Sequence, residues 1–232
     1  MTPPSDVRAV LFDFDGTLTD YVTADTAALE ALRQLACAHV PQGEFVQCAV
    51  NEIMAFHARV EAGESDPLRM DHERLTRTLA AYGVSCTDDH LAHFAAALLR
   101  ETVSSPGAVE LLTALHARGL RLGLLTNAYD GPSQRCRLSA CFPDGPFEAV
   151  VVAGEVGALK PDPRPFHALL DSMNVKPEEA VYIGDSPSHD VCGAVAVGLR
   201  AILIHPHPRL RERALALGAF AAVPDLASLL PA

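Results

Sequence analysis

Two aspartates stand two residues apart, directly after an apolar run near the start of the sequence. Asp13 and Asp15 follow the run 7–12 (VRAVLF), whose nearly continuous apolar character predicts a parallel strand buried on both faces. Open parallel sheets bind ligands beyond the carboxyl ends of their strands, so both carboxylates are expected to project toward one site. Two carboxylates this close repel each other unless a nearby charge compensates them. The pattern therefore indicates a metal ion, a shared proton or both.

The same residues have a simpler interpretation. An Asp-Gly pair is common in tight turns, and an aspartate often caps the helix that follows. The segment D-x-D-G-T would then be a structural turn without chemistry. Its position immediately after a buried strand favours the functional interpretation.

The rest of the chain contains the elements that could position such a site. Further strands are predicted by four short apolar runs: 121–125, 149–152, 180–183 and 199–204. Between these runs lie helical patterns that open at Pro106, at Pro163 or Pro165, and at Pro177. Strands that alternate with helices predict an α/β fold with a doubly wound parallel (Rossmann-like) sheet.

The stretch between the first and second strands breaks this alternation. It contains no strand-like run but four helical segments, at 24–39, 43–61, 66–82 and 87–103, and Thr87 and Asp88 offer caps for the last one. We therefore expect an all-helical cap domain at residues 19–104, inserted into an α/β core formed by residues 1–18 and 105–232.

The segment VLFDFDGTLTD, which contains Asp13 and Asp15, resembles the first motif of the haloacid dehalogenase-like hydrolase superfamily. The predicted helical insertion falls where members of that superfamily carry a helical cap. The resemblance extends over nearly the whole chain, because three further motifs follow in the expected order.

The segment LLTNA resembles the second motif of the family. This resemblance implies that the Thr126 hydroxyl and the Asn127 backbone N–H bind phosphate. The third resembles G-x-x-K-P-D-P and supplies Lys160, one of only two lysines in the chain. The fourth resembles G-D-x-x-x-x-D. It implies that Asp185 completes the metal site and that Asp190 orients Lys160 or a metal-bound water.

The resemblance implies a phosphatase that uses Mg²⁺, with Asp13, Asp15 and Asp185 as the metal residues. A divalent cation allows a phosphate dianion to approach several carboxylates. Asp13 would then attack phosphorus and form an aspartyl-phosphate, while Asp15 protonates the leaving oxygen and later takes a proton from water. Lys160 and Thr126 would stabilise charge on the phosphoryl oxygens.

Alternative activities fit the sequence less well. A halide-displacing dehalogenase has no need of a second aspartate such as Asp15, and a phosphonate hydrolase of the Schiff-base branch needs a cap lysine, which residues 19–104 lack. A phosphosugar mutase shares all four motifs and stays open. So does a non-catalytic binding or regulatory protein on the same scaffold. The segment GEVGALKPDPRPF is similar to the nucleotide and acylneuraminate phosphatase branch, and phosphoglycolate phosphatase is a further possibility.

Composition limits the partners. The 232 residues carry 18 basic and 29 acidic side chains, a net charge of −11, which argues against nucleic acid or an anionic membrane as partner. No apolar run is long enough to span a bilayer, and we find no leading signal segment. The six cysteines form no C-x-x-C pair and suggest reduced, buried thiols. We expect a cytoplasmic monomer or homodimer that acts on a small phosphorylated metabolite.

Two further groups of residues have weaker functional interpretations. Four cap arginines could bind a remote anionic group of the substrate: Arg59, Arg69, Arg74 and Arg77. The histidines of two other segments, His90 with His93 and His205 with His207, have the spacing of a chelating tract. Such groups are more often ordinary solvated helix charges, an exposed helix face or a proline-fixed loop.

Overall fold

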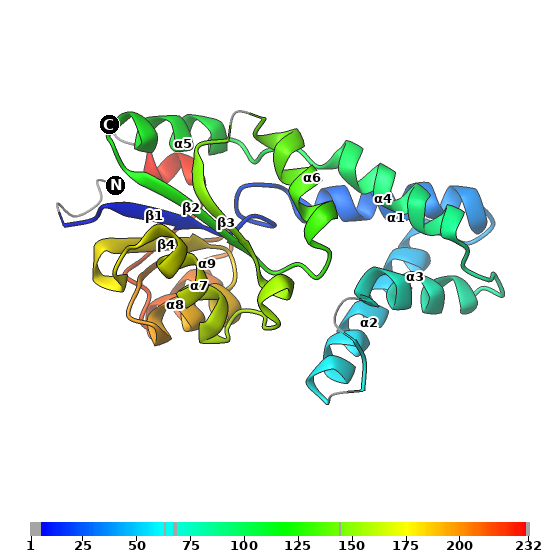
Figure 1. The fold of residues 1–232 in the computed structure, drawn as a ribbon. Helices are drawn as coiled ribbons and strands as arrows, with labels where there is room; N and C mark the ends of the chain where they lie inside the picture. The colour runs from blue at the N-terminus through cyan, green and yellow to red at the C-terminus, as the bar shows by residue number, and fades with distance from the viewer. Residues whose placement is uncertain (1–5, 63, 67–68, 144, 231–232) are drawn as a thin grey trace. The chain divides into compact units, whose positions relative to one another are not determined.

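A six-stranded parallel sheet forms the centre of the computed structural model, which describes residues 6–62, 64–66, 69–143 and 145–230 (Figure 1). The strands are β1 (Ala9–Phe12), β2 (Arg121–Thr126), β3 (Phe147–Val152), β4 (Ala180–Gly184), β5 (Arg200–Ile204) and β6 (Ala221–Val223). Their order is β3-β2-β1-β4-β5-β6, so the chain builds outward from β1 in both directions. This confirms the predicted doubly wound fold. The switch in direction places a ligand crevice between the carboxyl ends of β1 and β4.

Register brings the ends of the three central strands to one level. Phe12 of β1 is aligned with Leu124 of β2 and with Ile183 of β4. The residues that follow these strands therefore emerge side by side at one edge of the sheet. These are the segments that carry three of the four predicted motifs.

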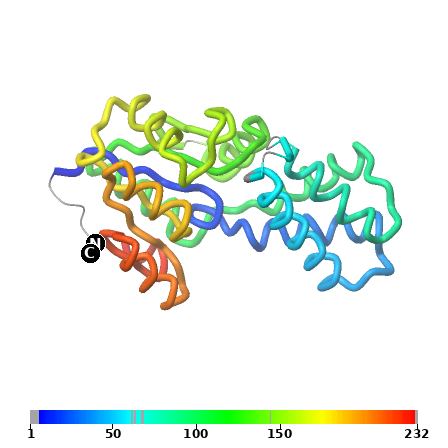
Figure 2. Tube along the Cα trace, turned by 90° about the horizontal axis from the view of Figure 1, so that it is seen from below, coloured from blue at the N-terminus to red at the C-terminus, as the bar shows by residue number. Residues whose placement is uncertain are grey.

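Helices cover both faces of the sheet (Figure 1). One face packs against α5 (Ala108–Ala117) and the short turn η5 (Leu226–Leu229), and the other against α7 (Pro163–Met173), α8 (Cys192–Ala196) and α9 (Pro208–Ala216). Figure 2 views the molecule from the side of this second layer. All four β1 residues are buried because alternate side chains enter the two layers.

Shorter segments complete the core. Helix α6 (Gly131–Cys141), which the sequence analysis did not anticipate, follows β2. The remaining turns are η2 (Ala153–Val156), η3 (Pro177–Glu179) and the π-helical turn η4 (Pro187–Val191). The helical pattern predicted after Pro177 forms only the single turn η3, because the apolar residues beyond it enter the buried strand β4. Strand β6 was also missed, since its three residues are only half-buried and give a weak pattern.

The helical segment between β1 and β2 forms a compact unit of its own, Tyr21–Val103, separate from Met1–Asp20 and Ser104–Ala232. Its helices are α1 (Tyr21–Ala36), α2 (Gln42–Glu61), α3 (Met70–Ala80) and α4 (Asp88–Glu101). The start of the helix predicted at 66–82 lies partly outside the described residues, at 67 and 68, and α3 begins at Met70. Thr87 caps α4 by accepting a hydrogen bond from the His90 backbone N–H, as predicted for this helix.

The cysteines differ from the expectation of buried thiols. None of the six forms a disulfide, but Cys37 is buried, Cys136 is exposed and the other four are half-buried. Cys136 is exposed on α6, although the next residue, Arg137, is buried. Adjacent residues of a helix lie on different faces, so one can face solvent while the next is buried. The expectation was therefore wrong for five of the six.

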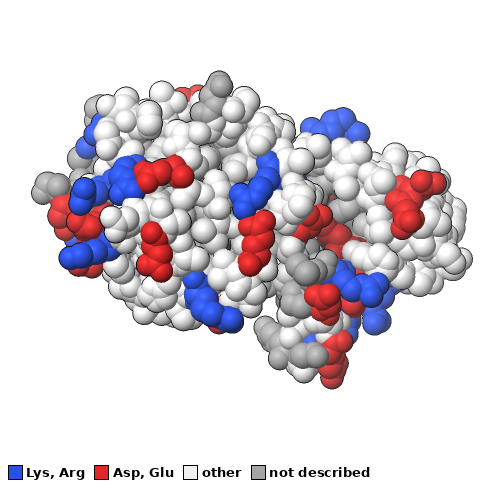
Figure 3. Space-filling view, viewed as in Figure 1, with Lys and Arg blue, Asp and Glu red and all other residues white. Residues whose placement is uncertain are grey.

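Surface charge agrees with the acidic composition. On the face drawn in Figure 3, arginines lie beside acidic side chains among the described residues and do not gather in one broad basic surface. Within the described part of the chain, none of the helices combines the length and the apolar character needed to cross a membrane.

An ion pair lies inside the helical unit. Arg74 of α3 donates to both carboxylate oxygens of Asp25 of α1 at 2.7 Å each, and its Nε donates to the Ala49 carbonyl at 3.2 Å. The Arg74 side chain is 1% exposed. This guanidinium is bound within the unit's own core, so its role is to join three helices.

We predict that Arg74→Ala destabilises the helical unit by about 3–5 kcal/mol, because it leaves the buried Asp25 carboxylate without its partner. Arg77→Ala, at an exposed position of the same helix, is the matched control and should change stability by less than about 0.5 kcal/mol. Chemical denaturation measures both. Equal stability of the two variants would contradict a structural role for Arg74.

Candidate active site

Asp13 lies directly after β1 and is almost completely buried. The Lys160 ammonium donates to its Oδ1 at 2.6 Å, and the Thr17 hydroxyl donates to its Oδ2 at 3.0 Å. Both oxygens of the carboxylate are thus held in fixed positions. A carboxylate fixed in this way at the end of a central strand is well placed to act as a nucleophile.

Lys160 is the centre of the buried polar network. Besides Asp13, its ammonium contacts Asp190 Oδ1 at 2.7 Å, the Tyr182 hydroxyl at 3.0 Å and the Leu125 carbonyl at 3.2 Å. Its side chain is 2% exposed, whereas Lys176, the other lysine, lies on the surface. Lys160 is therefore not a solvated surface lysine, and its network includes Tyr182, which was not identified from the sequence.

The pKa values in this network reflect burial and crowding of charge. Burial raises the pKa of Asp13 well above its ordinary value, and the Asp190 and Asp185 charges add to this effect against the attraction of Lys160. Burial alone would lower the pKa of Lys160, but the Asp13 and Asp190 carboxylates outweigh it and hold that pKa above its ordinary value. The ammonium therefore stays charged.

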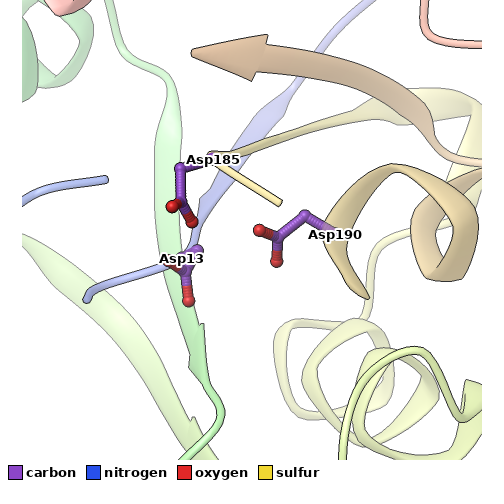
Figure 4. Close-up of side chains that lie close together, drawn as sticks. All are labelled: Asp13, Asp185 and Asp190. Atoms are coloured by element: carbon purple, nitrogen blue, oxygen red, sulfur yellow. The ribbon is translucent and has the colours of Figure 1, made fainter. Parts of the chain in front are cut away.

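Three carboxylates converge beside this lysine (Figure 4). Asp13, Asp185 and Asp190 each offer an oxygen within 4.8 Å of the others. Burial, with the charge of Asp190 next, raises the pKa of Asp185 to about 7. When all three carboxylates are ionised, they and the Lys160 ammonium sum to −2, so full ionisation requires further positive charge. Hard oxygen ligands and this deficit fit a divalent cation such as Mg²⁺.

Two glycines permit these close approaches. Gly16 has φ +89°, and a Cβ there would lie 2.5 Å from the Asp185 carboxylate. At Gly184 a Cβ would lie 2.3 Å from Cγ of Asp190. A side chain at either position would displace a member of the carboxylate cluster, which explains glycine in both motifs.

Asp15 occupies a different environment from Asp13. Arg137 of α6 donates to both of its oxygens, at 2.5 and 3.0 Å, and Gln134 donates to Oδ2 at 2.7 Å. The Thr19 hydroxyl donates to Oδ1 at 3.2 Å. The sequence analysis named Asp15 among the metal residues, but among the described residues the converging carboxylates include Asp190 and not the Asp15 side chain.

Thr126 and Asn127 follow β2, as the second motif requires. The buried Thr126 hydroxyl accepts a hydrogen bond from Gln134 at 2.8 Å, which leaves its own proton for another acceptor. The Asn127 side chain accepts from the Lys160 N–H at 2.8 Å and donates to the Lys160 carbonyl at 3.1 Å. Asn127 was expected to contribute its backbone N–H, and the structure adds this second role for its side chain.

The other predicted residues have local partners. Arg59 lies 3.5 Å from Glu73, Arg69 contacts His72, and Arg77 is exposed, all within the helical unit. Of the histidines, His205 accepts from the backbone N–H of His207. These local contacts favour the structural interpretation of the histidine tract.

Two residues of this site, Gln134 and Arg137, were missed from the sequence. A glutamine and an arginine three residues apart in a polar helix look like solvated surface residues. The signal that could have found them is the distance from the second motif: they lie seven and ten residues beyond Asn127, on one face of the following helix.

The fold and the four motifs define a class of enzyme. The chain belongs to the haloacid dehalogenase-like hydrolase family, whose model matches residues 7–198, which confirms the resemblance found in the motifs. Among its relatives, a phosphoglycolate phosphatase of Rhodospirillum rubrum is 35% identical over 238 residues, with 96% of this chain and 89% of the relative covered. An N-acylneuraminate-9-phosphatase of Rattus norvegicus is 29% identical, with 85% and 82% covered.

Solved structures agree on the fold. A HAD hydrolase of Bacillus subtilis, bound to magnesium, superposes with a TM-score of 0.79 at 22% identity and 96% coverage of both chains. The L-2-haloacid dehalogenase of Xanthobacter autotrophicus gives a TM-score of 0.75 at 21% identity, again with 96% of both chains covered. At these identities the likeness establishes the architecture alone.

The raised pKa of Asp185 predicts a linkage between pH, metal and stability. Because that pKa of about 7 exceeds the ordinary carboxyl value of about 4, the folded chain binds more protons than the unfolded chain between these pH values. Stability without a cation should therefore fall as pH rises through this window. A cation that replaces the proton should restore it.

We expect Mg²⁺ to raise the melting temperature more at about pH 8 than at about pH 5.5, relative to EDTA. Asp185→Asn should remove most of this difference, while the exposed control Asp171→Asn should keep it. Thermal unfolding of the three proteins at both pH values measures the effect. A Mg²⁺ gain that is independent of pH in the unmodified chain would contradict the assignment.

Proposed function

We propose that this protein is a Mg²⁺-dependent phosphatase that hydrolyses a small-metabolite phosphomonoester through an aspartyl-phosphate on Asp13. The observation that carries the proposal is the position of this carboxylate. The Asp13 carboxylate is buried and accepts hydrogen bonds from Thr17 and Lys160. It also belongs to the carboxylate cluster that contains Asp185. A nucleophile, a fixed cation and a metal-binding carboxylate thus lie within one network.

Mg²⁺ would be held by Asp13 and Asp185, with Asp190 in the same cluster, and Asp15 stays a predicted metal residue. When bound, the ion neutralises charge on the phosphate and the carboxylates, so that the substrate can approach. The net −2 of the cluster is the feature that supports this assignment.

The first step forms a bond from an Asp13 oxygen to phosphorus and breaks the bond to the leaving oxygen, which takes a proton from Asp15. In the second step water attacks the aspartyl-phosphate, Asp15 takes its proton, and Asp13 is released as the carboxylate. Lys160 and the Thr126 hydroxyl stabilise charge on the phosphoryl oxygens. The Thr126 proton is available for this purpose because Gln134 donates to its oxygen.

Phosphoglycolate is the first substrate to test, because the relative in Rhodospirillum rubrum named for it aligns with nearly the whole chain. Arg59, Arg69 and Arg77 of the helical unit are the proposed specificity residues. Arg74 is left out of this set, because its guanidinium is bound to Asp25.

The test is phosphate release from a panel of monoesters in Mg²⁺ and in EDTA, with phosphoglycolate, a sugar phosphate, a nucleoside monophosphate and an acylneuraminate 9-phosphate. We expect turnover of at least one ester with Mg²⁺ and its loss with EDTA. A chain with no turnover of any ester, or with full turnover in metal-free buffer, would contradict the proposal.

The two aspartates of the first motif should fail differently. Asp13→Asn removes the nucleophile, so the rate should fall by about 10⁴-fold or more and no phosphoenzyme should form. Asp15→Asn keeps the nucleophile but loses the proton donor and acceptor. With p-nitrophenyl phosphate, whose leaving group needs no proton, phosphoenzyme should therefore accumulate.

Acid quench with ³²P-labelled substrate measures the trapped label in each variant. Label on the Asp13→Asn protein would mean that another group, or water, attacks phosphorus.

A further inference from the structure

Helix α6 buries polar side chains where a helix packed on a core normally buries apolar ones. Its sequence is GPSQRCRLSAC, and its buried residues are Gly131, Gln134 and Arg137. Asp130 caps its start by accepting a hydrogen bond from the Ser133 N–H at 3.1 Å. Gln134 and Arg137 are three residues apart and therefore share one face of the helix.

These two side chains form one network with two predicted active-site residues. Gln134 donates through Nε2 to Asp15 and to Thr126, and its Oε1 accepts from Arg137 at 2.9 Å. Arg137 adds its two-pronged contact with the Asp15 carboxylate. The amide orientation of Gln134 satisfies all three partners at once, because donors meet acceptors at each contact.

The Arg137 guanidinium is itself fixed. It lies over the ring of the fully buried Phe14, with 5.5 Å between the guanidinium carbon and the ring centroid. Its side chain is 4% exposed, against 19% for Asp15. The arginine thus forms the inner wall and the carboxylate the outer, solvent-accessible end of the pair.

We propose that Arg137 and Gln134 are positioning residues that hold the Asp15 carboxylate in place for proton transfer to the leaving oxygen and from the attacking water. The inference rests on the proposed function, because it assigns a role to the same site. A proton donor misplaced by about 1 Å can cost about 10²-fold in rate. Arg137 acts through Asp15, Gln134 acts through Asp15 and also through the Thr126 hydroxyl, and neither is proposed to touch the reacting phosphorus.

The decisive variant is Arg137→Ala, compared on two kinds of substrate. For an alkyl monoester, whose leaving oxygen needs a proton, we expect turnover to fall by about 10²-fold. With p-nitrophenyl phosphate the first step should survive, giving a burst of nitrophenolate of about one per active site and then a slow steady state. Gln134→Leu should show the same pattern more weakly, and Arg137→Lys should recover part of the alkyl-ester rate.

Arg135→Ala is the matched control, because Arg135 is exposed on the same helix and pairs with Glu155 at the surface. It should leave both substrates unchanged. A variant that has lost its fold would lose the nitrophenolate burst and the alkyl-ester rate together. If Arg137→Ala behaves in this way, Gln134→Leu becomes the test of the inference, because it removes a hydrogen-bonding group without removing a buried charge.

A double-mutant cycle tests whether Arg137 acts through Asp15. If it does, adding Arg137→Ala to Asp15→Asn should change the rate by less than about 3-fold. Multiplicative losses in the double variant would mean that Arg137 acts directly on the substrate, which would overturn the inference while the proposed function stands. If the unmodified protein turns over no monoester at all, the proposed function fails, and the pair is then structural only.

Discussion

The site depends on one electrostatic constraint: three carboxylates from different segments converge around a single buried ammonium. Lys160 lies 2.6 Å from Asp13 and 2.7 Å from Asp190, and Asp185 completes the cluster. Burial makes each unbalanced charge costly, so the arrangement is stable only with a cation or with bound protons. Burial, with the charge of Asp190 next, raises the pKa of Asp185 to about 7, so a proton can take the place of a cation there.

The two aspartates of the first motif differ in surroundings although only one residue separates them. Asp13 lies beside Lys160 and the carboxylates of Asp185 and Asp190, whereas Asp15 is held by Arg137 and Gln134 at a partly exposed position. Separate environments allow two chemically identical groups to do different work, which fits the proposed roles of Asp13 as nucleophile and Asp15 as proton carrier.

The sequence was sufficient to predict five of the six described strands, the helical insertion and the positions of Asp13 and Asp185 at strand ends, because each depends on local patterns: apolar runs, prolines at helix starts and aspartates after strands. It did not predict Gln134, Arg137 or Tyr182, whose contacts join segments far apart in the chain. Arg74 was misread for the same reason, since its partner Asp25 lies 49 positions away. The residue type alone does not distinguish a buried arginine from an exposed one.

The side chain of Asn127 pairs with the backbone of Lys160 in both directions, accepting from its N–H and donating to its carbonyl. A neighbouring β-strand would make the same two hydrogen bonds to the backbone of Lys160. The side-chain amide of Asn127 therefore replaces a strand residue as the partner of this backbone. The main chain of Lys160 is thereby anchored to the segment that follows β2, in addition to the contacts of its charged side chain. Changes elsewhere in that loop can then be tolerated without moving the ammonium.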